Sequence, residues 1–393
     1  MSAALKAHGL DGKLVEPDWP ALTRAEIRSV LDEFSFLRGA VRILSVSPRP
    51  FSAASVVAAR SQRVFVKRHA SEVRNAEGLG EEHRFMQHLH ACGFPVAQVL
   101  VSDAGESAIE RGEWTYEVHR VPDAIDLYAE SISWTPFFSA AHARSAGEIL
   151  ARLHLAAEGY DAPARSGRPL VAGFTIFASP GPETSMQQYV AERPALTGYL
   201  HTRTCVADAL ELLSPFHNEL LPLLPALAPL WTHNDLHPSN LLWSSNSADA
   251  TATAVIDFGL SDRTNAVHDL AQAIERSMVD WLALVRDPLH PERVRIHYDH
   301  LRAFLDGYES VRPLTPEEAA ALAPLTALCH AEFALSETDY FLRTLHSEEK
   351  AWFACEGYLV AHAAWFRGPG EQLLQTLRDR ARTRPPNLGA KRT

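Results

Sequence analysis

The stretch "WTHNDLHPSNLLW", residues Trp231 to Trp243, holds two histidines, an aspartate and two asparagines. On a strand, His233, Asp235 and His237 would share one face, because strand side chains alternate with a period of two. Imidazoles and a carboxylate are ordinary zinc ligands, so this trio fits a metal-dependent hydrolase. The same letters also follow H-x-D-x-x-x-x-N, the spacing of a phosphoryl-transfer catalytic loop. The rest of the chain has to decide between these two interpretations.

The composition is that of a folded globular protein. The chain has 393 residues, of which 46% are hydrophobic and 22% are charged. This length suggests two or three domains, or one large domain with two lobes. The formal net charge of −11 argues against nucleic acid as the main partner, because nucleic acids are bound by basic surfaces. ATP stays open as a ligand, since it needs only a small local group of positive charges.

Cysteine usage and the opening residues predict a cytoplasmic protein. The four cysteines form no C-x-x-C pair and no framework spacing, so we expect them to be reduced. The first residues lack the apolar segment of a signal peptide, and no run of 18 apolar residues predicts a membrane span. The cysteines are Cys92, Cys205, Cys329 and Cys355.

A β-rich part of the chain precedes a mainly helical part. Alternating β-branched residues and turn residues predict two or three antiparallel strands within residues 41–69. A helical spacing of apolar residues follows within 77–95, and strand patterns return within 96–121. Beyond residue 125 the patterns are mostly helical, apart from a hairpin of "LLW" and "ATAVIDFG". The predicted fold class is α+β, with a small antiparallel sheet containing one helix beside a larger helical lobe.

A second motif, "VIDFGL", offers an oxygen ligand for a metal. Asp257 ends an apolar strand pattern and is followed by a turn that leaves its carboxylate free to face a site. It lies 17 residues after Asn240 of the opening motif, a separation that one hairpin spans. Mg²⁺ prefers such oxygen ligands together with phosphate oxygens. The two motifs together favour phosphoryl transfer and predict a metal site at Asn240 and Asp257.

The β-rich part should supply a cation for the phosphates. Lys67 closes the strand pattern "RVFVK", although a strand lysine is often only a solvated edge residue. A lysine that grips phosphates needs a carboxylate to hold it in place. Glu82, in the helix that follows, is the candidate, and its neighbour Glu81 offers the same group. As a set with the two motifs, these residues favour a phosphotransferase.

These residues resemble the aminoglycoside phosphotransferase and choline kinase superfamily, a group that includes bacterial homoserine kinases and stress-response kinases. "HNDLHPSN" matches the family's H-G-D-x-H-x-x-N loop, except that Asn234 stands in place of the glycine. "FVK" and "EHRFMQHLHACGFPV" resemble its strand lysine and helix glutamate, and "VIDFGLSDRTNAVHDLA" resembles its metal aspartate with the later D-L-A. The matches extend from Val41 to Ala271, with a vaguer echo in "LDGY". The resemblance implies a bilobal, protein-kinase-like fold.

The resemblance implies that MgATP is the phosphoryl donor. Asp235 would orient the acceptor hydroxyl and take its proton, and an unshifted carboxylate suffices because this proton moves late. Asn240 and Asp257 would hold Mg²⁺. Lys67, tied by Glu82, would contact the α- and β-phosphates.

Two further residues would support the site. Asp269 would brace the backbone of the catalytic loop, and His233 would be a buried, hydrogen-bonded support. His237 is read as a residue behind the reacting groups. The acceptor would be a small molecule with a hydroxyl group, such as an amino alcohol, an amino acid, a sugar or an aminoglycoside.

The implied organisation has five parts. They are an N-terminal extension (1–21), a small nucleotide-binding lobe (22–119), a hinge (120–124), a large helical lobe (125–378) and a basic tail (379–393).

Two regions depart from the kinase pattern or match it loosely. The turn "SPRPFSAAS" has no glycine, so small residues such as Ser52 and Ala53 would let backbone amides approach the phosphates. The backbone at Glu117 to His119, before the hinge, would pair with the adenine ring. Asn234 either hydrogen-bonds locally or reaches the site.

Three alternatives stay open. A protein Ser/Thr kinase of the same superfamily is disfavoured because no A-P-E motif or long activation segment follows "VIDFGL". A nucleotide-binding pseudokinase would need the loss of a catalytic residue, and none is lost. The metal hydrolase leaves Lys67, Asn240 and Asp257 unexplained. In the late helices, acids (Glu332, Glu337, Asp339) and aromatic residues suit a cationic amine acceptor or simply a packed core.

Overall fold

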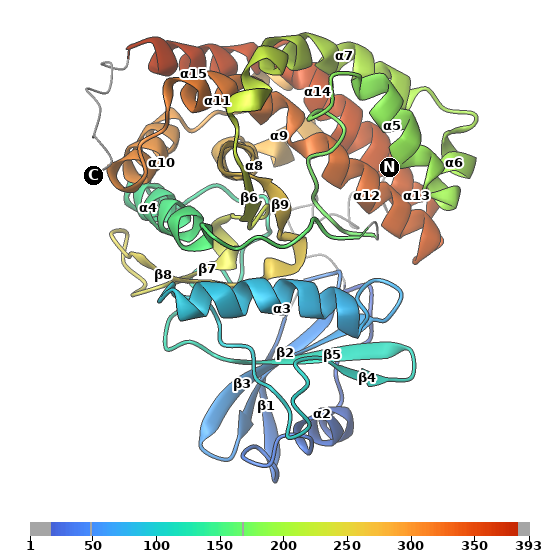
Figure 1. Ribbon diagram of the computed structural model, residues 1–393, viewed down its shortest axis with the longest axis vertical. Coiled ribbons are helices and arrows are strands. Elements are labelled where there is room, and N and C mark those ends of the chain that lie inside the picture. The colour runs from blue at the N-terminus through green and yellow to red at the C-terminus, as the bar shows by residue number, and fades with distance from the viewer. Residues whose placement is uncertain (1–16, 48, 167–168, 384–393) are drawn as a thin grey trace.

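The structure, a computed structural model, describes residues 17–47, 49–166 and 169–383. It has a small lobe built on an antiparallel sheet and a larger helical lobe, as predicted (Figure 1). Five strands form the sheet in the order β1-β2-β3-β5-β4. They are β1 (Val41–Val46), β2 (Ala53–Ala59), β3 (Gln62–Ala70), β4 (Ile109–Arg111) and β5 (Trp114–Arg120).

The alternation of β3 divides the small lobe into two faces. Val64 and Val66 are fully buried in a core shared with helix α2 (Arg24–Leu31). Lys67 points to the other face, where its cross-strand neighbour on β5 is Glu117. This second face lies toward helix α3 (Ala76–Ala91), which runs between the sheet and the helical lobe (Figure 1).

The small lobe holds two helices, whereas one was predicted. The apolar spacing that predicted α3 is confirmed, and the Asn75 side chain caps its first turn. Helix α2 was missed because it is only 8 residues long. Its signal is the capping box formed by Thr23 and Glu26, in which each side chain accepts the other residue's backbone N–H.

The helical lobe follows the connector after β5. Its main helices are α4 (Ala140–Ala157), α5 (Pro182–Ala191), α6 (Pro194–Leu200), α7 (Cys205–Leu220), α8 (Ala266–Met278), α9 (Trp281–Arg286), α10 (Tyr298–Val311), α11 (Pro316–Leu328), α12 (His330–Arg343), α13 (Glu348–Trp352), α14 (Ala361–Phe366) and α15 (Glu371–Thr383). A π-helix, Phe353–Val360, joins α13 to α14.

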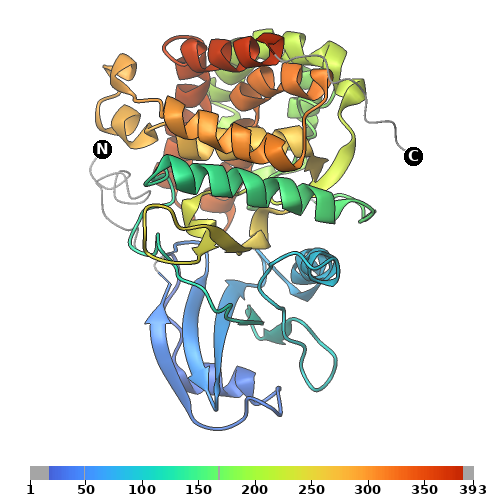
Figure 2. The same ribbon diagram turned by 90° about the vertical axis from the view of Figure 1, so that its left-hand side faces the viewer.

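Helices α4 and α10 pack side by side with their backbones in contact (Figure 2). A Cβ atom on Gly147 would lie 2.0 Å from the carbonyl oxygen of Phe304. A Cβ atom on Gly307, in the "LDGY" stretch, would lie 2.1 Å from the carbonyl oxygen of Arg144. Only glycine fits at these two positions, so they set how closely the helix pair approaches.

Two short two-stranded sheets carry the motif residues. The predicted hairpin is present as β7 (Leu241–Trp243) and β8 (Ala252–Val255). A second pair, β6 (Pro229–Thr232) and β9 (Asp262–Asn265), was not predicted. Strands of four residues with mixed polarity give no readable alternation, which is why the pattern missed them.

The two helices α11 and α12 form one continuous apolar stretch, Pro316–Arg343. Length and composition alone would let this stretch cross a membrane, but 94% of its most apolar window is buried inside the fold. That burial is the behaviour of a core helix.

The prediction of fully reduced cysteines is wrong for one pair. Cys205, which begins α7, and Cys355, in the π-helix, form a disulfide with their Cα atoms 6.3 Å apart. Both residues are fully buried. Cys92 and Cys329 are free thiols. The partners lie 150 positions apart, so no local spacing could have paired them.

The first residues of the predicted basic tail belong to a helix. Within the predicted tail, α15 continues to Thr383, and Arg380 pairs with Asp306 and Glu309 on α10. Residues 384–393 of that tail, and 1–16 of the N-terminal extension, lie outside the described residues.

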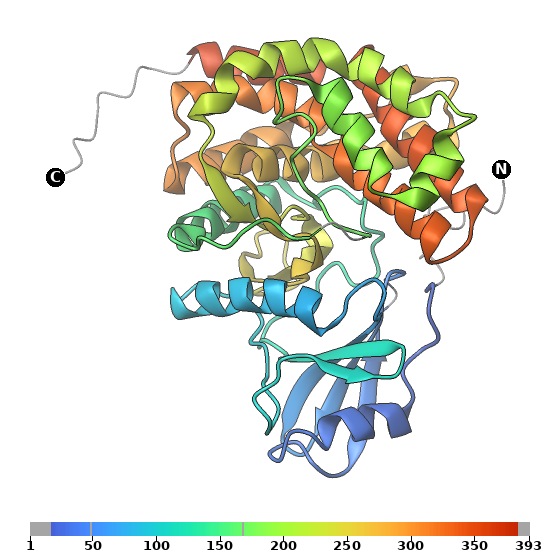
Figure 3. The same cartoon turned by 45° about the vertical axis from the view of Figure 1, so that its right-hand side comes forward.

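Within the predicted N-terminal extension, the residues after 16 start beside α12 and α13 and then run to the small lobe (Figure 3). Asp18 accepts hydrogen bonds from Lys350 (2.6 Å) and from the hydroxyl of Tyr340 (3.0 Å). Its own backbone N–H donates to the carbonyl of Pro50, in the turn between β1 and β2. Asp18 therefore connects the two lobes.

Candidate active site

A cavity of about 170 Å³ lies between the lobes. Of the site residues predicted from sequence, five line it, and six lie behind its walls. The lining residues are Ser52, Lys67, Asp235, Asn240 and Asp257, and the others are Ala53, Glu82, Glu117, His119, His233 and Asp269.

The loop from residue 233 to 240 leaves β6 and is not a strand, so the face-sharing trio does not exist. Asn240 donates from its amide nitrogen to both the backbone oxygen (2.9 Å) and the carboxylate (3.1 Å) of Asp235. These bonds orient the Asn240 amide, and its oxygen is left as the group available to a cation. Asp235 therefore enters the cavity with its carboxylate fixed from one side.

Asn234 takes the glycine position because the backbone there is left-handed, with φ of 59°. Asparagine tolerates this conformation better than most residues. Its side chain accepts from Thr232 and Thr264 and donates to the carbonyls of Ala172 and Leu260. The side chain hydrogen-bonds locally, and this answers the question that the sequence left open.

Asp269, at the start of α8, lies under the catalytic loop. Its two carboxylate oxygens accept the backbone N–H groups of His233 (2.9 Å) and Asn234 (2.8 Å), and His154 bonds to it at 3.0 Å. Burial alone would raise the pKa of Asp269, but these hydrogen bonds lower it. The expected bracing contact is present, and it keeps the carboxylate ionised.

The histidines of the loop are already engaged within the protein. His233 accepts the Asp235 backbone N–H on Nδ1 and bonds through Nε2 to the carbonyl of Ile256. His237 contacts Ser239 through Nδ1, and its Nε2 lies 3.8 Å from Asp235. Because both nitrogens of His233 are used, the trio that suggested a zinc hydrolase lacks a ligand.

Asp257 follows β8 in a left-handed conformation, with φ of 61°. The β7–β8 pairing and a hydrogen bond from Ile256 N–H to the Asn240 carbonyl bring Asp257 beside Asn240. Lys67 donates to the Asp257 carboxylate at 2.9 Å. Burial would raise the pKa of Asp257, but the Lys67 ammonium outweighs it and lowers the pKa to about 2.

Glu82 does not pair with Lys67, contrary to the expectation. Its carboxylate lies 3.3 Å from Arg165, which also pairs with Glu81 at the same distance. Arg165 donates in turn to the carbonyl of Gly259, two residues after Asp257. Glu82 thus connects α3 to the turn after Asp257. Besides Asp257, the acid near Lys67 is Glu117 of β5, 3.9 Å away.

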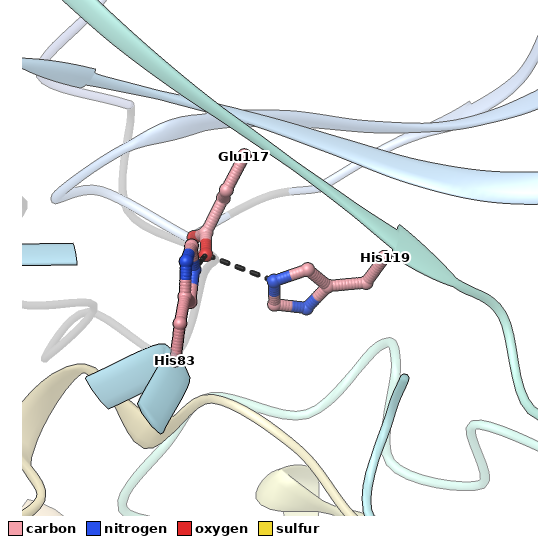
Figure 4. Close-up of side chains that lie close together, drawn as sticks. All are labelled: His83, Glu117 and His119. Carbon is pink, nitrogen blue, oxygen red and sulfur yellow. Dashed lines mark hydrogen bonds and ion pairs between the residues drawn. The ribbon is translucent and has the colours of Figure 1, made fainter. Parts of the chain in front are cut away.

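Glu117 is surrounded by three imidazoles. His83 from α3 and His119 from β5 approach one carboxylate oxygen at 2.8 and 2.9 Å (Figure 4). His69 approaches the other oxygen at 3.0 Å. Burial would raise the pKa of Glu117, but these partners, His119 above all, hold it well below its usual range. A charged Glu117 in turn supports the charge of Lys67.

His83, Glu117 and His119 are the one His/Cys/Asp/Glu group within the described ranges whose ligand atoms converge as in a metal site. Two neutral imidazoles and a carboxylate suit zinc. However, His83 and His119 already contact a Glu117 oxygen directly, at 2.8 and 2.9 Å, so the protein itself satisfies this group. We therefore assign the cluster to holding Lys67 in place.

Strand β5 ends at Arg120, the first residue of the predicted hinge. Glu117 and His119 lie inside β5, paired with β3, and His119 also bridges to Val99. Their side chains belong to the Glu117 cluster, so neither residue is part of an open connector. Beyond β5, Ile125 exchanges backbone hydrogen bonds with Trp243 of β7.

The turn between β1 and β2 contributes a residue that sequence reasoning missed. Arg49 lines the cavity with Ser52, whereas Ala53 already begins β2. Arg49 donates to the carbonyl of Ser131 and to the hydroxyl of Ser133, beyond the connector. A basic residue in a turn without glycine was the available signal, because phosphates need cations where backbone amides are less accessible.

The other end of the cavity is formed by α8 and α12. Arg276 of α8 lies 2.6 Å from Asp235 and over the ring of Phe333. Burial raises the pKa of Asp235 even with Arg276 beside it. Glu337 lines this end, and burial raises its pKa to about 8.

The three acids singled out in the late helices have different roles. Glu332 accepts the backbone N–H groups of Thr175 and Ile176, so it is structural. Asp339 is buried away from the cavity-lining residues. Only Glu337 faces the cavity, together with the aromatic side chains of Trp134, Phe333 and Phe341.

Comparison with known proteins gives one family. The family model for the phosphotransferase enzyme family matches residues 51–314. A homoserine kinase from Rhodospirillum rubrum is 29% identical over 223 residues, which are 57% of this chain and 59% of that protein. A homoserine kinase from Methylobacillus flagellatus is 28% identical over 218 residues, 54% of this chain and 57% of that protein. The chain thus spans less than two thirds of these curated relatives.

Solved structures share the fold. A microcompartment-associated aminopropanol kinase superposes with a TM-score of 0.58 at 18% identity, covering 91% of this chain and 99% of that one. An aminoglycoside phosphotransferase from Alicyclobacillus acidocaldarius has a TM-score of 0.52 at 14% identity, with 93% and 97% covered. At these identities the likeness shows the fold alone, and it confirms the predicted bilobal kinase-like architecture.

Proposed function

Because the chain belongs to the phosphotransferase enzyme family, we propose that it transfers the γ-phosphoryl group of ATP to the hydroxyl group of a small molecule. The observation that carries this proposal is that Lys67, Asn240, Asp257 and Asp235 line one cavity. They are the cation, the oxygen ligands and the carboxylate that phosphoryl transfer needs.

Each of these residues has a task. The acceptor oxygen attacks the γ-phosphorus, the bond to the bridging oxygen of ADP breaks, and the hydroxyl proton passes to Asp235. Lys67 and Arg49 offset phosphate charge. Asn240 and Asp257 would hold Mg²⁺, which when bound neutralises phosphate charge. Their oxygen-rich donor set, next to a cation for phosphate, fits that ion.

The walls of the cavity support a small acceptor and not a protein substrate. Asp235 is only 16% exposed at its side chain, and Phe333 and Trp134 line the same space. A loop of a protein substrate would need an open surface at the catalytic carboxylate. The pseudokinase alternative is not favoured by any feature, since the four residues of the cavity are intact.

An amine on the acceptor is supported by two observations. The relatives are named for homoserine, aminopropanol and aminoglycosides, and all three kinds of molecule carry an amine beside a hydroxyl group. In this chain, Glu337 and aromatic side chains line the end of the cavity beyond Asp235. A carboxylate with aromatic faces suits an ammonium group.

The test is ADP release with MgATP over a panel of amino alcohols, hydroxy amino acids, sugars and aminoglycosides. We expect one class to be phosphorylated, and Asp235→Asn to lower kcat by about 10³-fold while MgATP still binds. A fully active Asp235→Asn enzyme would remove the assigned base. Failure of the wild type to bind MgATP would remove the proposed function.

We also propose a cytoplasmic location, where ATP is supplied. The Cys205–Cys355 disulfide stands against it, since stable disulfides form mainly in oxidising compartments. The test is to purify the protein without reductant, unfold it and count its free thiols by mass spectrometry. Four free thiols would support a cytoplasmic location, and two free thiols would contradict it.

A further inference from the structure

Arg276 has an unusual set of contacts for a buried arginine. It is 7% exposed, lines the cavity, and contacts Asp235 through Nη1 at 2.6 Å. Its Nε and Nη2 atoms are both buried without a hydrogen-bond partner. Buried N–H groups are almost always paired, so this edge of the guanidinium lacks an acceptor.

The two unpaired atoms lie along the same edge of the planar guanidinium group. Nε–H and Nη2–H point in parallel and form the edge that holds a carboxylate through two hydrogen bonds. The ring of Phe333 lies 4.8 Å from the guanidinium carbon and fixes the orientation of its plane. The missing partner is therefore a carboxylate-like anion.

Glu337 is the acidic residue at the same end of the cavity. It lies one helical turn after Phe333 on α12, and it is 5% exposed. Among the described residues no ion pair joins it to Arg276, although both line one cavity. A buried guanidinium and a buried carboxyl group that are not paired with each other are complementary to the carboxylate and the ammonium of one zwitterion.

The contact between Arg276 and Asp235 limits the size of that zwitterion. Arg276, which would hold the acceptor carboxylate, lies directly beside Asp235, which would take the proton of the acceptor hydroxyl. The hydroxyl and the carboxylate of the acceptor must therefore be only a few bonds apart. Aminoglycosides and simple amino alcohols lack the carboxylate altogether.

We propose that the acceptor is a small hydroxylated α-amino acid, with Arg276 binding its carboxylate and Glu337 its ammonium group. This inference rests on the proposed phosphotransferase function and narrows its acceptor.

Matched acceptors test the proposal without any variant. Homoserine becomes 3-aminopropan-1-ol when the carboxylate is removed and 4-hydroxybutyrate when the amine is removed. Serine, ethanolamine and 3-hydroxypropanoate form the same set one carbon shorter. We expect kcat/KM for the best amino acid to exceed that of both its truncated forms by at least about 100-fold, because each truncation leaves a buried charge unpaired.

Two variants then assign the groups. Arg276→Gln should bring the ratio between the amino acid and its amino alcohol close to one, while Glu337→Gln should do so for the ratio to the hydroxy acid. A general loss of rate is expected in Arg276→Gln, since Arg276 also contacts Asp235. The readout is therefore the ratio of kcat/KM between acceptors. A purely structural role of Arg276 would lower kcat/KM equally for all acceptors and leave this ratio unchanged.

The outcomes separate this inference from the proposed function. Equal use of an amino acid and its amino alcohol by the wild type would overturn the inference, as would equal losses in Arg276→Gln. Transfer only to sugars or aminoglycosides, abolished by Asp235→Asn, would also overturn it and leave the phosphotransferase function standing. Absence of MgATP binding would overturn both.

Discussion

The two ends of the cavity treat charge in opposite ways. At the nucleotide end, Lys67 is bonded to Asp257 and lies beside Glu117, whose oxygens are occupied by three histidines. At the acceptor end, Arg276 keeps one edge free, and Glu337 faces the cavity without an ion-pair partner among the described residues.

Under the proposed function, this difference reflects what each end would bind. The phosphates and the metal need charges that are placed before binding, because a preorganised site loses little energy to reorganisation. The acceptor end is complete only when its ligand is present. Charged groups that are already paired within the protein would bind the phosphates and the metal, which every reaction of this kind shares. Groups without a partner would bind the acceptor, which differs from one enzyme to another.

The largest effect is expected from removing the metal ligand at the nucleotide end. Asp257→Ala should weaken Mg²⁺-dependent ATP binding by more than about 100-fold, since even changes behind metal ligands cost about 10- to 100-fold. Isothermal titration with MgATP, and with ATP plus EDTA, measures this. Wild-type affinity that is unchanged by EDTA would contradict the metal role of Asp257.

A matched pair of variants decides which acid holds Lys67. Glu117→Gln should raise KM for ATP roughly tenfold, or about 1.4 kcal/mol, because Lys67 loses a charged neighbour. Glu82→Gln should change KM for ATP far less and instead lower Tm, since Arg165 loses a buried partner. The reverse result would restore Glu82 as the partner of Lys67.

The smallest effect concerns pH at the acceptor end. Burial raises the pKa of Glu337 to about 8 in the free enzyme, despite Arg276 and Lys350 nearby. An ammonium group requires the ionised form, so kcat/KM for an amine acceptor should rise up to about pH 8. Glu337→Gln should flatten the rise in this pH profile, and an unchanged profile would place the amine elsewhere.

The same raised pKa has a consequence for stability. Between the unfolded value of 4.5 and about 8, folded Glu337 holds a proton that the unfolded chain has lost. The free energy of unfolding should therefore fall as pH rises through this window. Urea titrations of the wild type and Glu337→Gln at pH 5 and pH 8 measure the difference, which should be smaller in the variant.

Much of the fold and the nucleotide end was predictable because local rules specify them. Strand alternation placed Lys67, apolar spacing placed α3, and a single hairpin brought Asn240 and Asp257 together. The family resemblance implied the contact of Asp269 with the backbone of the loop that begins at His233.

The partner of Lys67 and the disulfide were not predictable, because both depend on contacts between distant segments. Glu117 became the neighbour of Lys67 through the register of β3 and β5, which the sequence pattern does not encode directly. The position of Arg276, in contrast, has a signal in the sequence. It follows Asp269 by seven residues, two helical turns, which places both on the face of α8 toward the catalytic loop.

Asp18 forms a second link between the two lobes, a clasp, in addition to the covalent hinge. Its carboxylate accepts hydrogen bonds from Lys350 and Tyr340, and its backbone N–H donates to Pro50 in the turn before β2, so separation of the lobes has to break one of these contacts. Under the proposed function, we therefore expect departure of ADP to be the slow event of each cycle. Rapid mixing should show a burst of product in the first turnover, and Lys350→Met should shorten the dwell of ADP; a linear start would show that the clasp does not limit release.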